Sequence, residues 1–154
     1  MKDKDFLKKY AEKLFSLLEI EGELTVTEDD ENINLNLQGE NLGHIIGFRG
    51  EVLGSFERVF SFALRKEKGD EVVGKRVTFD VGDYKKRREE KLVFIAQRVA
   101  DEVRSSGEPH KFSPMLASER RIIHNEISKY PSLVSYSMGE GQDRRLIVEP
   151  SEVK

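Results

Sequence analysis

The sequence predicts an α+β protein made of two small domains, and three observations support this. Apolar residues recur at three- and four-residue spacing in several segments, which is typical of amphipathic helices. Between them lie short segments in which apolar and polar residues alternate, as in strands with one face on a core. A chain of 154 residues is long enough for two small domains, and a new set of elements begins near residue 82. We therefore expect one domain at residues 1–81 and another at residues 83–150.

The first half is expected to begin with a helix over residues 3–20, where apolar side chains recur at helical spacing. Strands follow at residues 24–27 and 33–37, and the second alternates strictly between Ile or Leu and Asn. A helix with a broad apolar stripe is predicted over residues 52–64, ended by Lys68-Gly69-Asp70, and a third strand over residues 76–81. The element order is α-β-β-α-α-β, in which the short apolar segment 42–46 counts as a helix.

The most informative stretch is Gly47-Phe48-Arg49-Gly50, which follows the apolar pair Ile45-Ile46. Taken locally, we interpret this stretch together with its flanking residues as a strand, a tight Gly-x-x-Gly turn and a helix. Glycines without Cβ atoms let a nucleic-acid backbone come close, and the first N–H groups of the helix point at it. The alternative is a plain helix-entry turn. An aromatic residue at this turn can either stack on a base or fold back onto the core.

The second half is expected to begin with a long helix that opens on Lys85-Lys86-Arg87-Arg88 and ends at residues 105–109. This basic run is either a solvated helix face or a second contact surface for phosphates. Ser113-Pro114 predicts the start of another helix, with Ser as N-cap and Pro in the first turn, and Pro131 ends it. Two short strands, 133–137 and 144–149, complete the half.

Four patches occur in a fixed order, and together they are far more specific than any one of them. They are Ile45-Ile46-Gly47-x-x-Gly50, Tyr84-x-x-Arg87-Arg88-Glu89, Glu119-Arg120-Arg121-Ile122-x-His124, and Ser137-x-Gly139 followed by Arg144-Arg145. On these residues, roughly 40–150 of the chain resembles the Jag (SpoIIIJ-associated) family of bacterial RNA-binding proteins. The resemblance implies a type-II-like KH domain, followed by an Arg-x-x-x-His domain with helices packed on a small β-sheet.

The resemblance also implies function. The expected ligand is single-stranded RNA or single-stranded DNA, and the expected role is post-transcriptional regulation linked to cell growth, cell shape, envelope processes or chaperone activity. The expected protein partner is a second copy or a single-domain KH protein. The RNA-binding residues it implies are Ile46, Gly47, Phe48, Arg49, Gly50, Arg120, His124, Ser137, Gly139 and Arg144.

The sequence departs from the family pattern at the turn and in the loop before the last strand. Phe48 and Glu51 stand where basic, polar or neutral residues are usual, and Gln142 replaces a usual proline. Phe48, Glu51 and the acidic first quarter of the chain favour a rival function, a protein-interaction adaptor or dimerisation module whose KH surface no longer binds nucleic acid. Arg120 and His124, one helical turn apart, are likewise either a binding pair or a plain surface pair.

Charge and composition reduce the number of functional classes that fit the sequence. Residues 1–40 hold 5 Lys/Arg against 11 Asp/Glu, so the rest of the chain is net basic although the total charge is −3. There is no Cys, and His44, His110 and His124 form no metal-binding spacing, so we expect no metal, cofactor or catalysis. Glu108-x-His110 lacks a neighbouring nucleophile. No apolar run approaches the ~18 residues of a membrane span, and the charged first residues do not suit a signal peptide. We therefore expect a cytoplasmic protein without membrane insertion.

Overall fold

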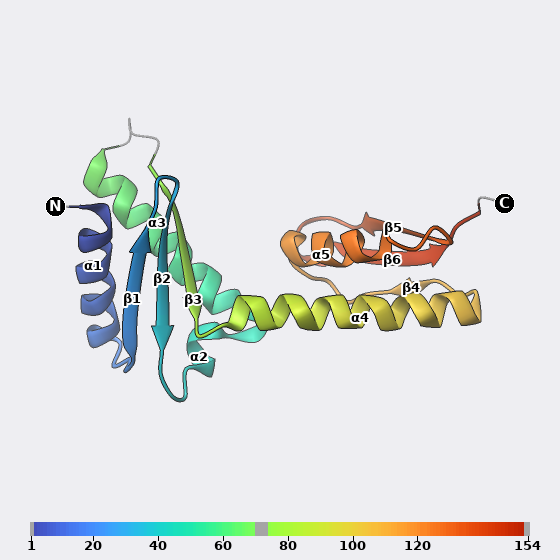
Figure 1. Cartoon of the computed structure of the whole chain (residues 1–154), viewed down its shortest axis with the longest axis horizontal. Coiled ribbons are helices and arrows are strands. Elements are labelled where there is room, and N and C mark those ends of the chain that lie inside the picture. Colours follow the sequence, from blue (N-terminus) through green and yellow to red (C-terminus); the bar gives the residue numbers. More distant parts are fainter. Residues whose placement is uncertain (1, 70–73, 153–154) are drawn as a thin grey trace. The chain divides into compact units, whose positions relative to one another are not determined.

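The segment in which Asn alternates with Ile and Leu forms β2 (Asn32–Gln38), the central strand of a three-stranded sheet of order β1-β2-β3. Its Ile and Leu side chains are buried, whereas its Asn side chains lie on the opposite, polar face. β1 (Glu23–Glu28) pairs with it antiparallel, and β3 (Arg76–Val81) pairs with it parallel. Two helices, α1 (Asp3–Leu17) and α3 (Glu51–Lys68), cover the apolar face (Figure 1).

The computed structural model describes residues 2–69 and 74–152, and the chain divides into two units, Met1–Lys85 and Lys86–Lys154. The first unit contains the three strands above and the second contains a separate sheet, so the predicted α+β class is confirmed. Asp70, part of the predicted helix breaker, lies outside the described residues. Among the described residues, no helix is long and apolar enough to cross a membrane.

Both long helices of the first unit differ in length from the prediction. α1 spans Asp3–Leu17 and ends before the expected residue 20, because Glu19 has a left-handed backbone with φ 55. α3 spans Glu51–Lys68 and is longer than the expected 52–64. Aromatic rings of both helices meet β3 in the core, where the ring centroids of Phe60 and Phe79 lie 5.4 Å apart. Leu53, in the first turn of α3, is buried in the same core, so packing holds the start of the helix that follows the Gly-x-x-Gly turn.

The segment before the turn is a helix, α2 (Gly43–Ile46), as the element order predicted. The local interpretation of a strand entering the turn is wrong. The Ile45 N–H donates to the Leu42 carbonyl, and the Gly47 N–H donates to the Gly43 carbonyl, both at 3.0 Å. A four-residue apolar run does not distinguish strand from helix by its periodicity, which explains the error.

Two carboxylates bind backbone N–H groups of β3, which is an outer strand of its sheet. Glu57 of α3 accepts a hydrogen bond from the Phe79 N–H at 3.0 Å, and Asp80 accepts one from the Val81 N–H at 2.9 Å. Glu57 also binds the Lys85 ammonium at 2.6 Å. Lys85, the first residue of the basic run, is therefore held by an internal ion pair.

The second unit is built on a three-stranded antiparallel sheet of order β4-β6-β5. Its strands are β4 (His110–Lys111), β5 (Leu133–Met138) and β6 (Arg145–Pro150), and a short helical turn, η2 (Gly141–Asp143), precedes β6. α4 (Tyr84–Ser106) and α5 (Ala117–Ile127) supply the helices. The helices and one face of the sheet share a core that includes Val99, Ala100, Ile123, Leu146 and Val148. Helices on a small sheet are what was predicted.

The predicted helix start at Ser113-Pro114 is wrong, since α5 begins at Ala117 and its N-cap, Leu116, makes no side-chain capping bond. The intervening residues instead run beside β6. The Phe112 N–H donates to the Leu146 carbonyl at 2.9 Å, and the Met115 N–H donates to the Arg144 carbonyl at 3.4 Å. Pairing with a distant strand thus overrides the local capping signal. β4, which was not predicted from the sequence, was missed for the same reason.

Candidate nucleic-acid interface

The Gly-x-x-Gly turn has a backbone that demands glycine at its first position. Gly47 has φ 71 and ψ −174, a region that is essentially restricted to glycine. A Cβ atom built there would lie 2.4 Å from Cγ2 of Val52, closer than any real contact. Gly50 also has a positive φ, 79, and a Cβ there would lie 3.0 Å from the ring of Tyr84. Both glycines are therefore required by the fold.

Phe48 and Arg49 lie between these glycines at the exposed tip of the turn. The Phe48 side chain is 75% exposed, so it does not fold back onto the core. Arg49 has φ 53, which is unusual for a residue with a side chain, and its guanidinium carbon lies 4.9 Å from the centre of the Phe48 ring. The turn therefore presents an aromatic ring and a cation together, whereas Ile46 packs against the core.

The turn leads directly into α3, for which Gly50 is the N-cap residue. Gly50 has no side chain, so no side-chain cap occupies the N–H groups of the first turn of the helix. These groups and the helix dipole favour an anion. Glu51 in the same turn is exposed and adds a negative charge that opposes a phosphate. Arg49 is the cation that offsets it.

In the second unit, Arg120 of α5 is tied to the loop that precedes its helix. Its Nη1 donates to the Met115 carbonyl at 2.6 Å, and its Nε is buried without a hydrogen-bond partner among the described residues. The Met115 N–H in turn donates to the Arg144 carbonyl. One backbone residue therefore links the Arg120 side chain to the main chain of Arg144, which brings these two predicted site residues together.

His124, one turn after Arg120, is exposed and bonded to the neighbouring strand. Its Nδ1 lies 2.6 Å from Oγ of Ser135 in β5. Ser135 was not among the predicted residues, although it shares a face of β5 with the predicted Ser137, two residues later. The two-residue period of strands was therefore a signal that could have identified it. His124 of α5 and Ser135 of β5 are therefore joined directly across the two elements.

Gly139 and Arg144 belong to the turn between β5 and β6. Gly139 has φ 92, and a Cβ there would lie 3.0 Å from the Asp143 carbonyl oxygen. Its own carbonyl accepts a hydrogen bond from Nη1 of Arg144 at 2.7 Å. Arg144 was expected in the last strand but precedes β6. Its guanidinium is thus held by this turn.

Arg88, in the basic run, forms an ion pair inside the second unit. Its Nε lies 2.7 Å from Oε1 of Glu119, whose side chain is 6% exposed. Glu119 directly precedes Arg120, so this pair fixes the first turn of α5 against α4. Because Lys85 is also paired, two of the four cations in the run have internal partners. The run as a whole is therefore not a free phosphate-binding surface.

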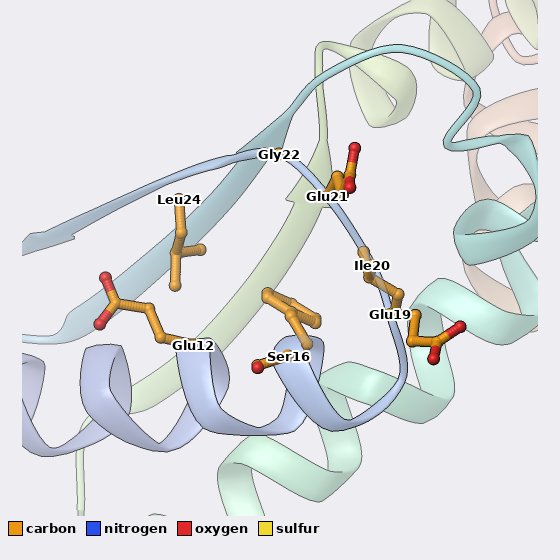
Figure 2. Close-up of a pocket in the computed structure, with 8 residues that line it drawn as sticks. Glu12, Ser16, Glu19, Ile20, Glu21, Gly22 and Leu24 are labelled. Atoms are coloured by element: carbon orange, nitrogen blue, oxygen red, sulfur yellow. The ribbon is translucent and has the colours of Figure 1, made fainter.

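A hollow of about 650 Å³ lies between the end of α1 and the start of β1 (Figure 2). Glu12, Glu19 and Glu21 contribute carboxylates around it, and these point in different directions (Figure 2). Its described lining contains no Lys or Arg. A phosphate backbone would be repelled here. No group of three or more His, Asp or Glu side chains suited to a metal ion occurs in residues 2–69 and 74–152.

Comparison with known proteins places both units in described families. Residues 4–75 match the KH domain of KhpA/KhpB. Residues 90–150 match the R-3-H domain, which takes its name from an arginine and a histidine separated by three residues. The first match contains the Gly47–Gly50 turn, and the second contains Arg120 and His124.

The chain is also similar to curated proteins named RNA-binding protein KhpB. It is 32% identical to the protein of Bacillus subtilis, in a match that covers 92% of this chain and 67% of the relative. It is 30% identical to the protein of Clostridium symbiosum, in a match that covers 90% of this chain and 62% of the relative. The protein of Streptococcus pneumoniae is 32% identical over 91% of this chain, which spans only 42% of that relative. The expected resemblance is confirmed, and the chain belongs to the KhpB family, for which Jag is another name.

Proposed function

We propose that this chain binds single-stranded RNA through the Gly47–Gly50 turn and the surface formed by Arg120 and His124. The observation that carries this proposal is the tip of the turn, where an exposed Phe48 ring and the Arg49 guanidinium lie between two glycines of positive φ. Relatives over most of the chain are named RNA-binding proteins, which supports the same ligand.

Each group has a chemical role in this proposal. The uncapped N–H groups of α3 and the Arg49 guanidinium bind phosphate, and the Phe48 ring stacks on a base. In the second unit, the Arg120 guanidinium is oriented by its bond to Met115 and the His124 ring by its bond to Ser135. Ser137, Gly139 and Arg144 complete the second surface. Single-stranded DNA is the second ligand that such contacts accept.

We extend the proposal to the role of the protein. It acts in the cytoplasm as a post-transcriptional regulator linked to growth, cell shape or envelope processes, without catalysis, metal or cofactor. Chaperone activity towards RNA belongs to the same proposal. The domain limits that we propose remain residues 1–81 and 83–150.

The exposed surface of α3 favours a second candidate, dimerisation. Val52, Val59 and Phe62 are 36%, 41% and 65% exposed, and their spacing places them on one face of the helix. Large apolar side chains gathered on one exposed face are typical of protein contacts. The partner in this case is a second copy or a single-domain KH protein. Sedimentation of the chain with and without RNA separates this candidate from RNA binding.

The test of RNA binding uses substitutions that spare the fold. Arg49→Gly removes the guanidinium and gives a residue suited to positive φ, and Phe48→Ala removes an exposed ring. With fluorescence anisotropy on a labelled single-stranded RNA, we expect both to weaken binding while the melting temperature is maintained. Arg65→Gln, which removes an exposed cation at the far end of α3, is the matched control and should bind like the unaltered chain.

The dependence on salt adds an independent readout. Three to five neutralised phosphates give a log–log slope of about −2 to −4 on a single strand. Arg49→Gly should reduce this slope by about 0.7, whereas Phe48→Ala should leave it unchanged. Duplex of the same sequence should bind more weakly. Unaltered affinity in both folded variants, or a preference for duplex, would contradict the proposal.

A further inference from the structure

The sheet of the second unit has a second face that the proposed function does not use. Leu133, Leu146 and Val148 point from one face into the core, and Ser135 and Ser137 lie on that same side of β5. Val134, Tyr136 and Met138 therefore lie on the opposite face, where they are 40%, 40% and 52% exposed. We call this surface the open face.

On the open face, two sets of cross-strand neighbours each contain one cation. Tyr136 of β5 pairs with Ile147 of β6, which pairs with Lys111 of β4, and Met138 pairs with Arg145. Adjacent strands lie about 4.8 Å apart, so both cations lie within the reach of a ligand that covers Tyr136. Neither Lys111 nor Arg145 has a side-chain hydrogen bond or ion pair with any other described residue.

The carboxylate on the open face is already engaged. The Tyr136 hydroxyl donates to Oε2 of Glu149 at 3.1 Å, which holds the phenol ring over the sheet. Ile147, the cross-strand neighbour of Tyr136 on the same face, is only 4% exposed, so an apolar side chain lies beside the ring. An aromatic ring held on a sheet beside two unpaired cations is the arrangement with which open sheets bind single-stranded nucleic acids.

The position of β5 connects the open face to the surface proposed above. β5 is an outer strand of its sheet. Ser135, bonded to His124, projects from one side of β5, and Tyr136, the next residue, projects from the other. A flexible single strand that leaves His124 can therefore cross the edge of the sheet within one residue of β5. A helical duplex is too stiff and wide to follow this path.

We propose that the open face is a second contact surface for single-stranded RNA, on which a base stacks on Tyr136 and phosphates bind Arg145 and Lys111. This inference rests on the proposed function, because it extends the path of the same RNA. The strands present two cations on the open face, Lys111 and Arg145, against the one carboxylate of Glu149, and this net positive charge favours RNA over an apolar protein partner.

The experiment measures the affinity of the intact chain for a labelled single-stranded RNA at several salt concentrations. Tyr136→Ala should weaken binding by about 5- to 150-fold, the range for one stacked base, without changing the salt slope. Tyr136→Phe keeps the stacking ring and loses only the hydrogen bond to Glu149, so it should retain most of the affinity that Tyr136→Ala loses. Lys111→Gln with Arg145→Gln should weaken binding and reduce the slope by about 1.4. Lys91→Gln, an exposed cation of α4, is the charge control.

The outcomes separate this inference from the proposed function. If Phe48→Ala and Arg49→Gly weaken binding but the open-face variants bind like the unaltered chain, the open-face proposal is overturned and RNA binding stands. If the unaltered chain binds no RNA, both the proposed function and the open-face proposal are overturned. If Tyr136→Ala abolishes self-association in sedimentation at unchanged RNA affinity, the face is a protein interface instead. Should Tyr136→Ala fail to fold, the Lys111 and Arg145 double variant decides the question, because neither side chain belongs to the core.

Discussion

His124 of α5 and Ser135 of β5 form a contact of 2.6 Å between the imidazole Nδ1 and the hydroxyl Oγ. The helix supplies the imidazole, and the strand sets its orientation. With Nδ1 engaged, Nε2 is the nitrogen left for a ligand, and no described residue binds it. The orientation of His124 therefore depends on a residue that lies outside the Arg-x-x-x-His motif.

Ser135→Ala should weaken RNA binding about two- to tenfold, the usual effect of losing one hydrogen bond. The ring of His124 would lose its fixed orientation while the strand persists. Ser135→Thr keeps a hydroxyl and suits a strand, so it should retain affinity. Anisotropy with one RNA and all three proteins checks this. Equal affinity for Ser135→Ala and the unaltered chain would exclude a positioning role for Ser135.

Gly47→Ala should destabilise the first unit by about 2–5 kcal/mol, from backbone strain together with overpacking against Val52. Gly54→Ala is the matched control, because a Cβ there meets nothing within 4 Å and Gly54 lies inside α3. That control should be stabilising by about 0.5–1 kcal/mol. Thermal melts of both variants test the difference. If Gly47→Ala had the same melting temperature as the unaltered chain, the turn would accommodate the added Cβ atom without loss of stability, and the prediction would be wrong.

Breaking the Arg88–Glu119 pair should destabilise the second unit strongly. Glu119 is buried, so Arg88→Met leaves its carboxylate without the cation and costs about 3–5 kcal/mol. Changing both residues, to Met and Leu, should restore much of the loss, because an apolar pair needs no partner. Denaturant unfolding followed by circular dichroism measures both. If the double variant were no more stable than Arg88→Met, the loss of stability would come from other contacts of the two side chains and not from the unpaired charge of Glu119.

Asp80 should make stability depend on pH. Partial burial raises the pKa of its carboxyl, against the opposing effect of the Val81 and Lys85 N–H groups that bind it. Because the folded state holds this proton more tightly than the unfolded chain does, the group contributes stability at low pH. This contribution is lost as the pH rises through the folded-state pKa. Asp80→Asn should therefore be more stable than the unaltered chain at about pH 7, and this gain should shrink as the solution is acidified.

The measurement for Asp80 is denaturant unfolding at several pH values. Glu40→Gln, which removes an exposed carboxylate from the same unit, is the control and should show no comparable gain. A variant that is less stable at neutral pH would mean that the negative charge supports the start of α4 more than burial penalises it.

Elements with a strong local signal could be predicted from the sequence. β2 was predicted because Asn alternates with Ile and Leu, and α3 because its apolar stripe is broad. The helix start at Ser113 was mispredicted, and β4 was missed, because hydrogen bonds to the distant β6 decide those segments.

The same distinction holds for the site. Gly47 and Gly50 were identifiable because a backbone requirement acts within four residues of sequence. The strand period places Ser135 on the same face as Ser137, but its contact with His124, like the Arg120–Met115 and Arg88–Glu119 contacts, joins separate elements, and no local pattern reports such contacts. The family motif identified Arg120 and His124, whereas the groups that hold them required the fold.

The carboxylates of Glu57 and Asp80 have a consequence for growth of the sheet in the first unit. An outer strand normally offers its N–H groups to any extended chain that approaches, which is how aggregates begin. On β3, the N–H groups of Phe79 and Val81 are already occupied by these carboxylates. An incoming chain would have to displace two charged acceptors to add a strand there. Strand addition at the β3 edge is therefore hindered where these two N–H groups lie, and β1 forms the other edge of the sheet.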